Sequence, residues 1–505
     1  MPLNDTYDLQ PISSYDLKRP QYMVFCVIIS SLGFFCNGWV IGSANLPGKM
    51  THACETENFQ ISTIFPDCLP MNEALWGFAV ASFCIGGLMA SLSGGYIQNR
   101  YGRKYVICYN SLGYVFGAVL ISCATSTAMF IVGRIMCGYS CGLGSLAIPI
   151  YIGEISTIKA RGTMGAFTQG MITLGILISS VAGLPLSTVP LWRANYALVA
   201  VPAFLQLVTM HFCVESPRFL ISKHQIEAAK INLQRLRSGA SIDIEFYNMV
   251  EGQLGSEIAM FVTHRSSSST DKLDFDDLTL VPQQKQVTKA DAMNLIEIFR
   301  DPFIRSIAVI VIIVHMLQQL IGINAVMYYS TSMFEVVFPS GDMSKYMSIV
   351  TVALNFVATV ISILVIDRMG RRTLILFSIT GATIFLVQLV VGYVYQVDAL
   401  LIVSVLGYVC SFAVGMGPIP WIIIAELTPV PASASVGAIA TSLNWTMNFL
   451  VGQCFPVLFS KMQGYAFIIF CLFGFIYAAF VYIWLPETKG KSFEDITMEL
   501  KKRRL

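Results

Sequence analysis

Amide side chains occur inside long apolar stretches of this chain, where uncharged polar groups are costly to bury. Each amide offers one hydrogen-bond acceptor and two donors without carrying a charge, and such groups can bind a neutral molecule rich in hydroxyls. Polar residues within membrane-spanning helices mark either a pathway or a contact between helices. Both interpretations stay open for this set, which comprises Gln169, Gln318, Gln319, Asn324, Asn355, Asn444 and Asn448.

Groups that could transfer protons or electrons are scarce in the same stretches. The predicted helix cores contain no Asp or Glu, and His315 is the one buried candidate for a proton relay. A histidine hydrogen-bonded within its own helix is the alternative interpretation. No phosphate-binding glycine loop, metal-ligand cluster or nucleophile–base pair stands out. We therefore expect no catalytic residues, no metal, no cofactor, no nucleic-acid partner and no ATP-driven pump.

Long apolar segments carry these residues. Apolar residues make up 55% of the chain and charged residues only 12%, against roughly 25% charged in an ordinary soluble domain. A helix needs about 20 apolar residues to cross a bilayer. The chain is therefore predicted to be an all-α membrane protein of twelve transmembrane helices, at about 22–46, 74–97, 105–124, 128–152, 164–186, 194–214, 303–332, 346–366, 373–396, 399–425, 432–459 and 464–485.

Three motif pairs recur in one order and at nearly one spacing. Asn-Arg-Tyr-Gly-Arg-Lys at 99–104 returns as Asp-Arg-Met-Gly-Arg-Arg at 367–372. Glu154 matches Glu426, and Glu215 matches Glu487, each 272 positions further on. A repeat of this kind indicates a duplication. We expect two related six-helix halves, an arrangement typical of transporters.

The distribution of basic residues predicts the topology. Short loops rich in Lys and Arg all fall on one side of a twelve-span chain, which makes that side and both termini cytoplasmic. The charge-rich stretch between the halves is expected to be a cytoplasmic linker whose first part, Ile226–Leu236, forms an amphipathic helix. The predicted organisation is an N-terminal segment 1–21, a bundle 22–215, the linker 216–301, a second bundle 302–485 and a tail 486–505.

Two further features suggest modifications. Cys54 and Cys68 lie in the long loop at about 47–73, which is predicted to be extracellular. Two thiols on an oxidising face can form a disulfide, and two free thiols are the alternative. The serine run Ser266–Ser269 in the linker offers a phosphorylation site, although a plain linker is the simpler interpretation.

An ordered set of motifs resembles the sugar porters of the major facilitator superfamily, and within them the facilitative, GLUT-type glucose transporters. The resemblance runs from about residue 22 to 492. Besides the three repeated pairs, it is carried by Gln-Gln-Leu-Ile-Gly-Ile-Asn-Ala-Val-Met-Tyr-Tyr-Ser (318–330), Gly-Pro-Ile-Pro-Trp (417–421), Asn-Trp-Thr-Met-Asn-Phe (444–449) and Pro-Glu-Thr-Lys-Gly (486–490). The resemblance implies a hexose carrier in the plasma membrane that works by alternating access, with no enzyme activity and with a monomer sufficient for function.

The resemblance also implies roles for individual residues. Gln169, Gln318, Gln319, Asn324 and Asn355 would hydrogen-bond the sugar and Trp421 would stack on it, with Phe412, Asn444 and Asn448 as further candidates. Tyr328 and Tyr329 would form the extracellular gate, and Pro418 and Pro420 the hinge, since proline removes helix hydrogen bonds. At the cytoplasmic ends, an ion-pair network is expected from Arg100, Glu154, Arg161, Glu215, Arg368, Arg372, Glu426 and Glu487.

Departures from the family pattern bear on coupling and on the sugar. Val40 stands where proton-coupled relatives carry an Asp that faces an Arg of helix 4, here Arg134. This favours a uniporter over the alternatives of a proton-coupled symporter or a non-transporting sugar sensor. Ala413, Ile321 and Thr168 depart from residues common in glucose-preferring members. D-glucose remains the expected substrate, with fructose, galactose or a polyol as alternatives.

Overall fold

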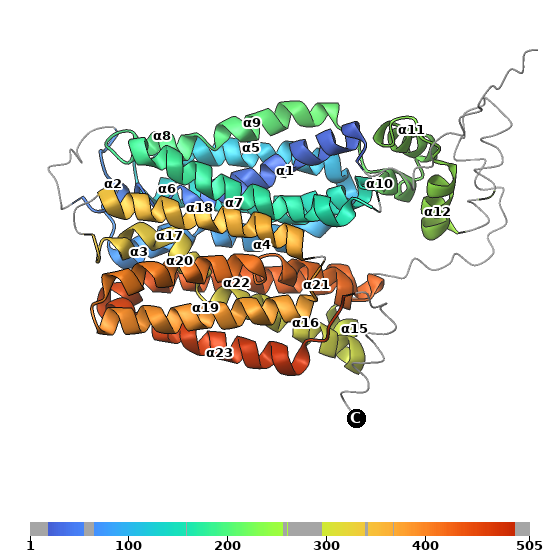
Figure 1. Ribbon diagram of the computed structural model, residues 1–505. Helices are drawn as coiled ribbons and strands as arrows, with labels where there is room; N and C mark the ends of the chain where they lie inside the picture. The colour runs from blue at the N-terminus through green and yellow to red at the C-terminus, as the bar shows by residue number, and fades with distance from the viewer. Residues whose placement is uncertain are drawn as a thin grey trace, which may run out of the picture.

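The structure is a computed structural model that describes residues 19–54, 65–157, 159–255, 260, 295–338, 342–366 and 368–489. Its long helices run roughly side by side, with the first half of the chain above the second in the view of Figure 1. The described residues are almost entirely helical, as predicted. The serine run 266–269, the N-terminal residues 1–18 and the tail from 490 onward lie outside the described residues.

Six membrane spans form each half of the described chain. In the first half they are α1 (Gln21–Gly42), α3 with α4 (Glu73–Ala81, Phe83–Tyr101), α5 (Arg103–Ser122), α6 (Thr127–Ile155), α7 (Arg161–Leu186) and α8 with α9 (Trp192–Ala197, Ala200–Thr209). In the second half they are α16 with α17 (Pro302–Leu320, Ile323–Phe334), α18 (Asp342–Val365), α19 (Arg371–Val394), α20 with α21 (Asp398–Val414, Ile419–Leu427), α22 (Val430–Met462) and α23 (Phe467–Trp484).

Length and hydropathy identify 11 candidate spans in the described residues. The last of them, Ser435–Trp484, is 50 residues long and contains both α22 and α23, separated by the short 3-10 helix Gln463–Ala466. Because a helix of about 20 residues already crosses a bilayer, this stretch is two spans. The structure therefore confirms a multi-pass membrane protein with the predicted twelve helices.

Close helix packing explains the abundance of small residues in these spans. A Cβ on Gly138 of α6 would lie only 1.8 Å from the carbonyl oxygen of Phe83 on α4. Membrane helices gain much of their stability from such close backbone approach at small residues. We conclude that α4 and α6 depend on this glycine for their spacing.

A break divides the span formed by α16 and α17. Gly322 has φ +93° in the left-handed region, and a Cβ there would lie 2.6 Å from the Phe470 ring. Only glycine adopts such a conformation readily. The break places Gln318 and Gln319 at the end of α16 and Asn324 at the start of α17, so that amides from both pieces can converge.

Three short helices follow the first half: α10 (Pro217–Ser222), α11 (Ile226–Leu236) and α12 (Asp243–Leu254). Helix α11 has the predicted bounds, and its apolar face packs into a small core shared with α10 and α12. The fully buried Arg237 donates to Glu245 and to the carbonyl of Ile155 at the end of α6. This arginine attaches the three helices to the first half.

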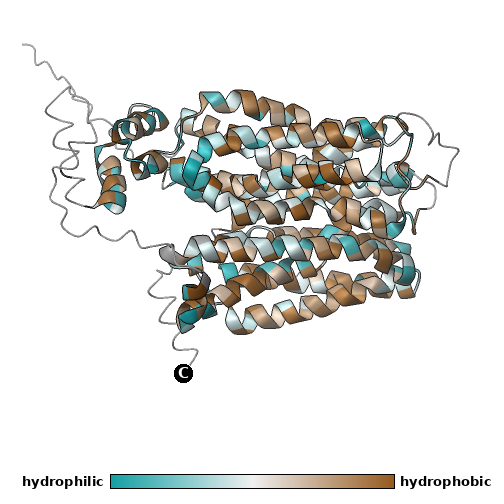
Figure 2. Cartoon of the chain, turned by 180° about the vertical axis from the view of Figure 1, so that it is seen from behind, coloured by the Kyte–Doolittle hydropathy of each residue, from teal (hydrophilic) through white to brown (hydrophobic). Residues whose placement is uncertain are grey.

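The molecule has two polar ends. One end, called here the linker end, carries α10–α12 and the short helix α15 (Leu295–Arg300) (Figure 1). The other, called the loop end, carries α2 (Gly48–His52) and the Cys54–Cys68 disulfide, whose Cα atoms are 5.7 Å apart. Hydrophilic residues gather toward the two ends, and hydrophobic residues cover the helices between them (Figure 2).

Candidate substrate site between the two halves

Four of the predicted amides form one hydrogen-bonded chain. Asn324 Nδ2 donates to Gln319 Oε1 at 2.5 Å, and Gln319 Nε2 donates to Asn444 Oδ1 at 3.1 Å. Asn444 Nδ2 in turn donates to Gln318 Oε1 at 3.0 Å. All four side chains are buried. This chain of amides links α16, α17 and α22. The side chains of Gln318 and Gln319 point about 100° apart on their helix, yet the structure brings both to one place.

Gln318 connects this chain to the interrupted span of α20 and α21. Its Nε2 donates to the carbonyl of Met416 at 2.7 Å and to that of Gly417 at 3.3 Å. These carbonyls lie in the turn between the two helices, and the residue four positions after Met416 is Pro420, which has no N–H to donate. Pro418 precedes α21 as its N-cap, and Pro420 lies in its first turn. The prolines therefore stand where the span is interrupted.

The other residues predicted to contact the sugar form no hydrogen bond to these four amides in the described structure. Gln169 on α7 reaches from the first half, and its Nε2 lies 3.7 Å from where a Cβ on Gly417 would be. Asn355 on α18 places its Nδ2 4.0 Å from the sulfur of Met327. Trp421 is 37% exposed and Phe412 is buried. The arrangement offers neutral donors, acceptors and an accessible indole, which suits a polyhydroxylated ligand.

The two predicted gate tyrosines lie on α17 and are hydrogen-bonded to α22. Tyr328 donates from its hydroxyl to Asn448 Oδ1 at 2.7 Å, and its ring packs edge-on against Phe83 of the first half. Tyr329 donates to the carbonyl of Gly452 at 3.0 Å. Both tyrosines are buried, so the site has no opening toward the loop end through these rings.

Sequence reasoning missed Asn45, which joins the two halves at the loop end. Its Nδ2 donates to the hydroxyl oxygens of Ser330 at 2.7 Å and Ser348 at 2.9 Å, and its Oδ1 accepts from the N–H of Thr331. The signal in the sequence was an amide at the end of the first apolar segment, which was predicted at about 22–46. An ion pair between Lys49 of α2 and Glu335, 2.5 Å apart, adds a second link between the halves.

The linker end has ion pairs within each half. Arg103 Nη2 lies 3.2 Å from Glu154 Oε1, and Arg371 Nε lies 3.2 Å from Glu426 Oε1. Each of these two ion pairs stays within its own half, whereas the Lys49–Glu335 pair joins the halves at the loop end. Together with Asn45 and Lys49 at the opposite end, this arrangement is a conformation closed at the loop end.

The arginines predicted for this network make other contacts in this structure, and the network itself stays a prediction. Arg100 donates to the Tyr96 hydroxyl, and Arg372 donates to the Tyr482 carbonyl. Arg161 and Arg368 form no ion pair within the described ranges. The arginines that pair with the glutamates here are Arg103 and Arg371, which begin the helix after each glycine turn.

Glu215 and Glu487 hold the two glycine turns. Glu215 Oε1 accepts from the N–H groups of Arg103 and Lys104, and Glu487 Oε1 accepts from the N–H of Arg371 at 2.7 Å. Burial raises the pKa of the Glu215 carboxyl, and the hydrogen bonds from backbone N–H groups oppose this shift. The equivalent bonds in both halves match the repeat seen in the sequence.

The observed pairing of Arg103 with Glu154 gives a test with a matched control. Replacing Arg103 by Ala should lower the maximal transport rate about tenfold, because one charge-assisted bond worth about 1.5–3 kcal/mol is lost. Replacing Arg100 by Ala should change it less than twofold. Initial rates, normalised to surface protein, would measure both; a larger loss in the Arg100 variant would contradict the assignment.

Arg134 is a buried cation without a carboxylate partner in the described part of the chain. It is 1% exposed, and its Nη1 and Nη2 each donate at 2.8 Å, to the carbonyls of Val40 and Val80. Its guanidinium also lies over the Phe83 ring, 5.0 Å from the centroid. Val40 occupies the position at which an acidic partner for Arg134 was considered. Its backbone carbonyl accepts the hydrogen bond from Arg134.

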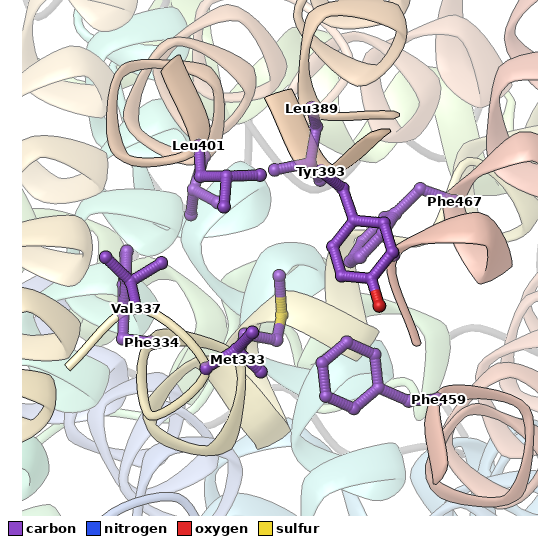
Figure 3. Close-up of a pocket in the computed structure, with 11 residues that line it drawn as sticks. Met333, Phe334, Val337, Leu389, Tyr393, Leu401, Phe459 and Phe467 are labelled. Atoms are coloured by element: carbon purple, nitrogen blue, oxygen red, sulfur yellow. The ribbon is translucent and has the colours of Figure 1, made fainter. Parts of the chain in front are cut away.

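A separate apolar hollow lies near the loop end of the second half (Figure 3). It is lined by Met333, Leu389, Tyr393, Phe459 and Phe467, among others. Its lining contains none of the amides described above. The amide chain, and not this hollow, is the candidate site for a hydroxyl-rich substrate.

Comparison with known proteins identifies the family. The model of the family described as sugar (and other) transporters matches residues 25–500. The chain belongs to this sugar transporter family. It is 34% identical to solute carrier family 2, facilitated glucose transporter member 3, of mouse over 489 residues, which cover 94% of this chain and 92% of that protein. The human protein of the same name is also 34% identical, over 94% of this chain and 91% of its own length.

Solved structures give the same fold. The partially occluded inward-open conformation of the xylose transporter XylE from E. coli matches with a TM-score of 0.70 at 23% identity, covering 94% of this chain and all of that one. The proton:xylose symporter XylE bound to 6-bromo-6-deoxy-D-glucose, of the major facilitator superfamily, matches with a TM-score of 0.69. This sugar transporter therefore has the major facilitator fold of those structures, and the family it belongs to consists of transporters and not enzymes.

Proposed function

We propose that this sugar transporter is a facilitative hexose uniporter, with D-glucose as its main substrate, that works by alternating access. The amide chain of Gln318, Gln319, Asn324 and Asn444 is the observation that carries this proposal. Hydroxyl groups both donate and accept, and neutral amides match them without a charge. The facilitated glucose transporters among the relatives support the choice of hexose.

The same proposal assigns sugar contacts to the other predicted site residues. Gln169 and Asn355 would contact the sugar when the halves approach, and Trp421 would stack on its ring with Phe412 behind it. A few net hydrogen bonds of about 1 kcal/mol each correspond to millimolar affinity. Such weak binding suits a carrier, because the sugar must also leave.

Uniport is favoured over proton symport by the charges in the membrane. A proton-coupled carrier needs a group inside the membrane that gains and loses a proton between states. In the described spans, carboxylates occur only at helix ends, and Arg134 bonds to the backbone of Val40 instead of an acid. Transport should then follow the sugar gradient alone.

The proposed orientation places the loop end outside the cell and the linker end in the cytoplasm, in the plasma membrane. Basic residues at the turns of the linker end and a disulfide at the loop end support this orientation. The structure would then be an inward-facing state. The ion pairs Arg103–Glu154 and Arg371–Glu426 would engage the opposite half when the linker end closes.

Counterflow in proteoliposomes tests the substrate class. Vesicles loaded with unlabelled D-glucose should transiently accumulate labelled D-glucose, and loading with galactose or fructose should give less. Counterflow only with fructose or a polyol inside would show that this sugar, and not glucose, is the substrate. Ala413 and Ile321 would then be the first residues to mutate. Absence of counterflow with every sugar would contradict a carrier function.

A further inference from the structure

His315 is a completely buried residue at the edge of the amide chain. It lies on α16, three and four positions before Gln318 and Gln319, and is 0% exposed. Its backbone carbonyl accepts a hydrogen bond from Asn444 Nδ2 at 3.0 Å. The backbone of His315 is therefore bonded to α22 at the candidate site, one turn of α16 before the two glutamines.

One nitrogen of this imidazole has no hydrogen-bond partner among the residues that the structure describes. Nδ1 lies 2.9 Å from the carbonyl oxygen of Val311. Because a carbonyl can only accept, Nδ1 carries the proton, and the neutral ring then presents a lone pair at Nε2. Nε2 is buried, and no hydrogen-bond donor reaches it from the described part of the chain. An unsatisfied buried acceptor is unfavourable, so a donor that arrives with a ligand would relieve this cost.

The surroundings indicate which ligand could supply that donor. The imidazole meets the Trp421 indole edge to face, with centroids 5.2 Å apart and planes at 90°. The amides of Gln318, Gln319, Asn324 and Asn444 are already bonded to one another, whereas Nε2 is not. The free acceptor thus lies beside the ring proposed to stack on the sugar.

We propose that His315 Nε2 accepts a hydrogen bond from one hydroxyl of the bound hexose. This inference rests on the proposed hexose transport and assigns one further contact to that site. The indole of Trp421 moves away from the imidazole as it stacks on the sugar, and the hydroxyl takes its place. His315 therefore helps to select sugars that carry a hydroxyl at one particular ring position.

Monodeoxy sugars test this contact directly. In cells that express the wild-type chain, each monodeoxy-D-glucose would compete with labelled D-glucose for uptake. One of them should compete about five- to tenfold less well than D-glucose because it lacks the donor for Nε2. His315→Phe keeps an aromatic ring but has no acceptor. In cells that express this variant, D-glucose and that deoxy sugar should compete equally well with labelled D-glucose.

Two further variants protect the test from a folding defect. His315→Gln retains an acceptor and should keep the wild-type discrimination, whereas His315→Leu lacks one and should lose it. If the acceptor-free variants keep every deoxy penalty of the wild type, the imidazole only supports Trp421 and the proposal is wrong. Wild-type cells that take up no hexose would contradict the proposed function itself.

Discussion

Replacing Gln318 by Ala should lower hexose uptake at least 100-fold while the protein still reaches the cell surface. The side chain donates to Met416 and accepts from Asn444, so its removal takes one hydrogen-bond partner from each of these two buried groups. Each such group costs about 1–3 kcal/mol, and the sugar also loses a predicted contact. Labelled-hexose uptake, with surface biotinylation in parallel, would measure the effect.

A second buried amide provides the control for this experiment. Gln206 on α9 donates to the carbonyls of Ile29 and Ser30 within the first half. Gln206→Ala should reduce the amount of folded protein without changing the sugar concentration for half-maximal uptake. If Gln318→Ala behaves in the same way as Gln206→Ala, α16 would not be part of the sugar site.

Replacing Asn45 by Ala should shift the protein toward a state open at the loop end. Three hydrogen bonds between the halves are lost, to Ser330, Ser348 and Thr331. At about 1 kcal/mol each, their loss changes the ratio of the two states by roughly 100-fold. Hydrogen bonds within each half are unaffected, so the variant should fold.

Spin-label distances across the loop end would report this shift. Leu191 in the first half and Val397 in the second are both exposed at this end, and labels there should move apart in the Asn45 variant. Lys345→Ala is the matched control, because Lys345 pairs with Asp342 on its own helix. Equal distances in wild type and Asn45→Ala would show that Asn45 does not hold the closed state.

Much of the fold follows from local patterns in the sequence. Apolar segments of bilayer length predicted the twelve helices, and the bounds of α11 followed from its alternation of apolar and charged residues. The repeated carboxylates Glu154 and Glu426 gave the ion-pair positions because each closes a span at the same place in its half. These features depend on neighbours in the chain, which a sequence displays.

Features that depend on distant neighbours were harder to predict. Arg100 and Arg103 lie three positions apart in one motif, and only the geometry of the turn at Gly102, with φ +93°, decides which arginine faces Glu154. The partners of Asn45 lie 285 and 303 positions away. The joining of Gln318 and Gln319 through Asn444 likewise depends on how α22 packs against α16.

The uptake of labelled D-glucose into cells without their own hexose carriers, with and without a protonophore, tests the central proposal most directly. A uniporter predicts saturable uptake that stops when the internal and external concentrations are equal and that the protonophore does not change. Accumulation above the external concentration that collapses with the protonophore would contradict uniport and would make His315 the first residue to examine as a proton site.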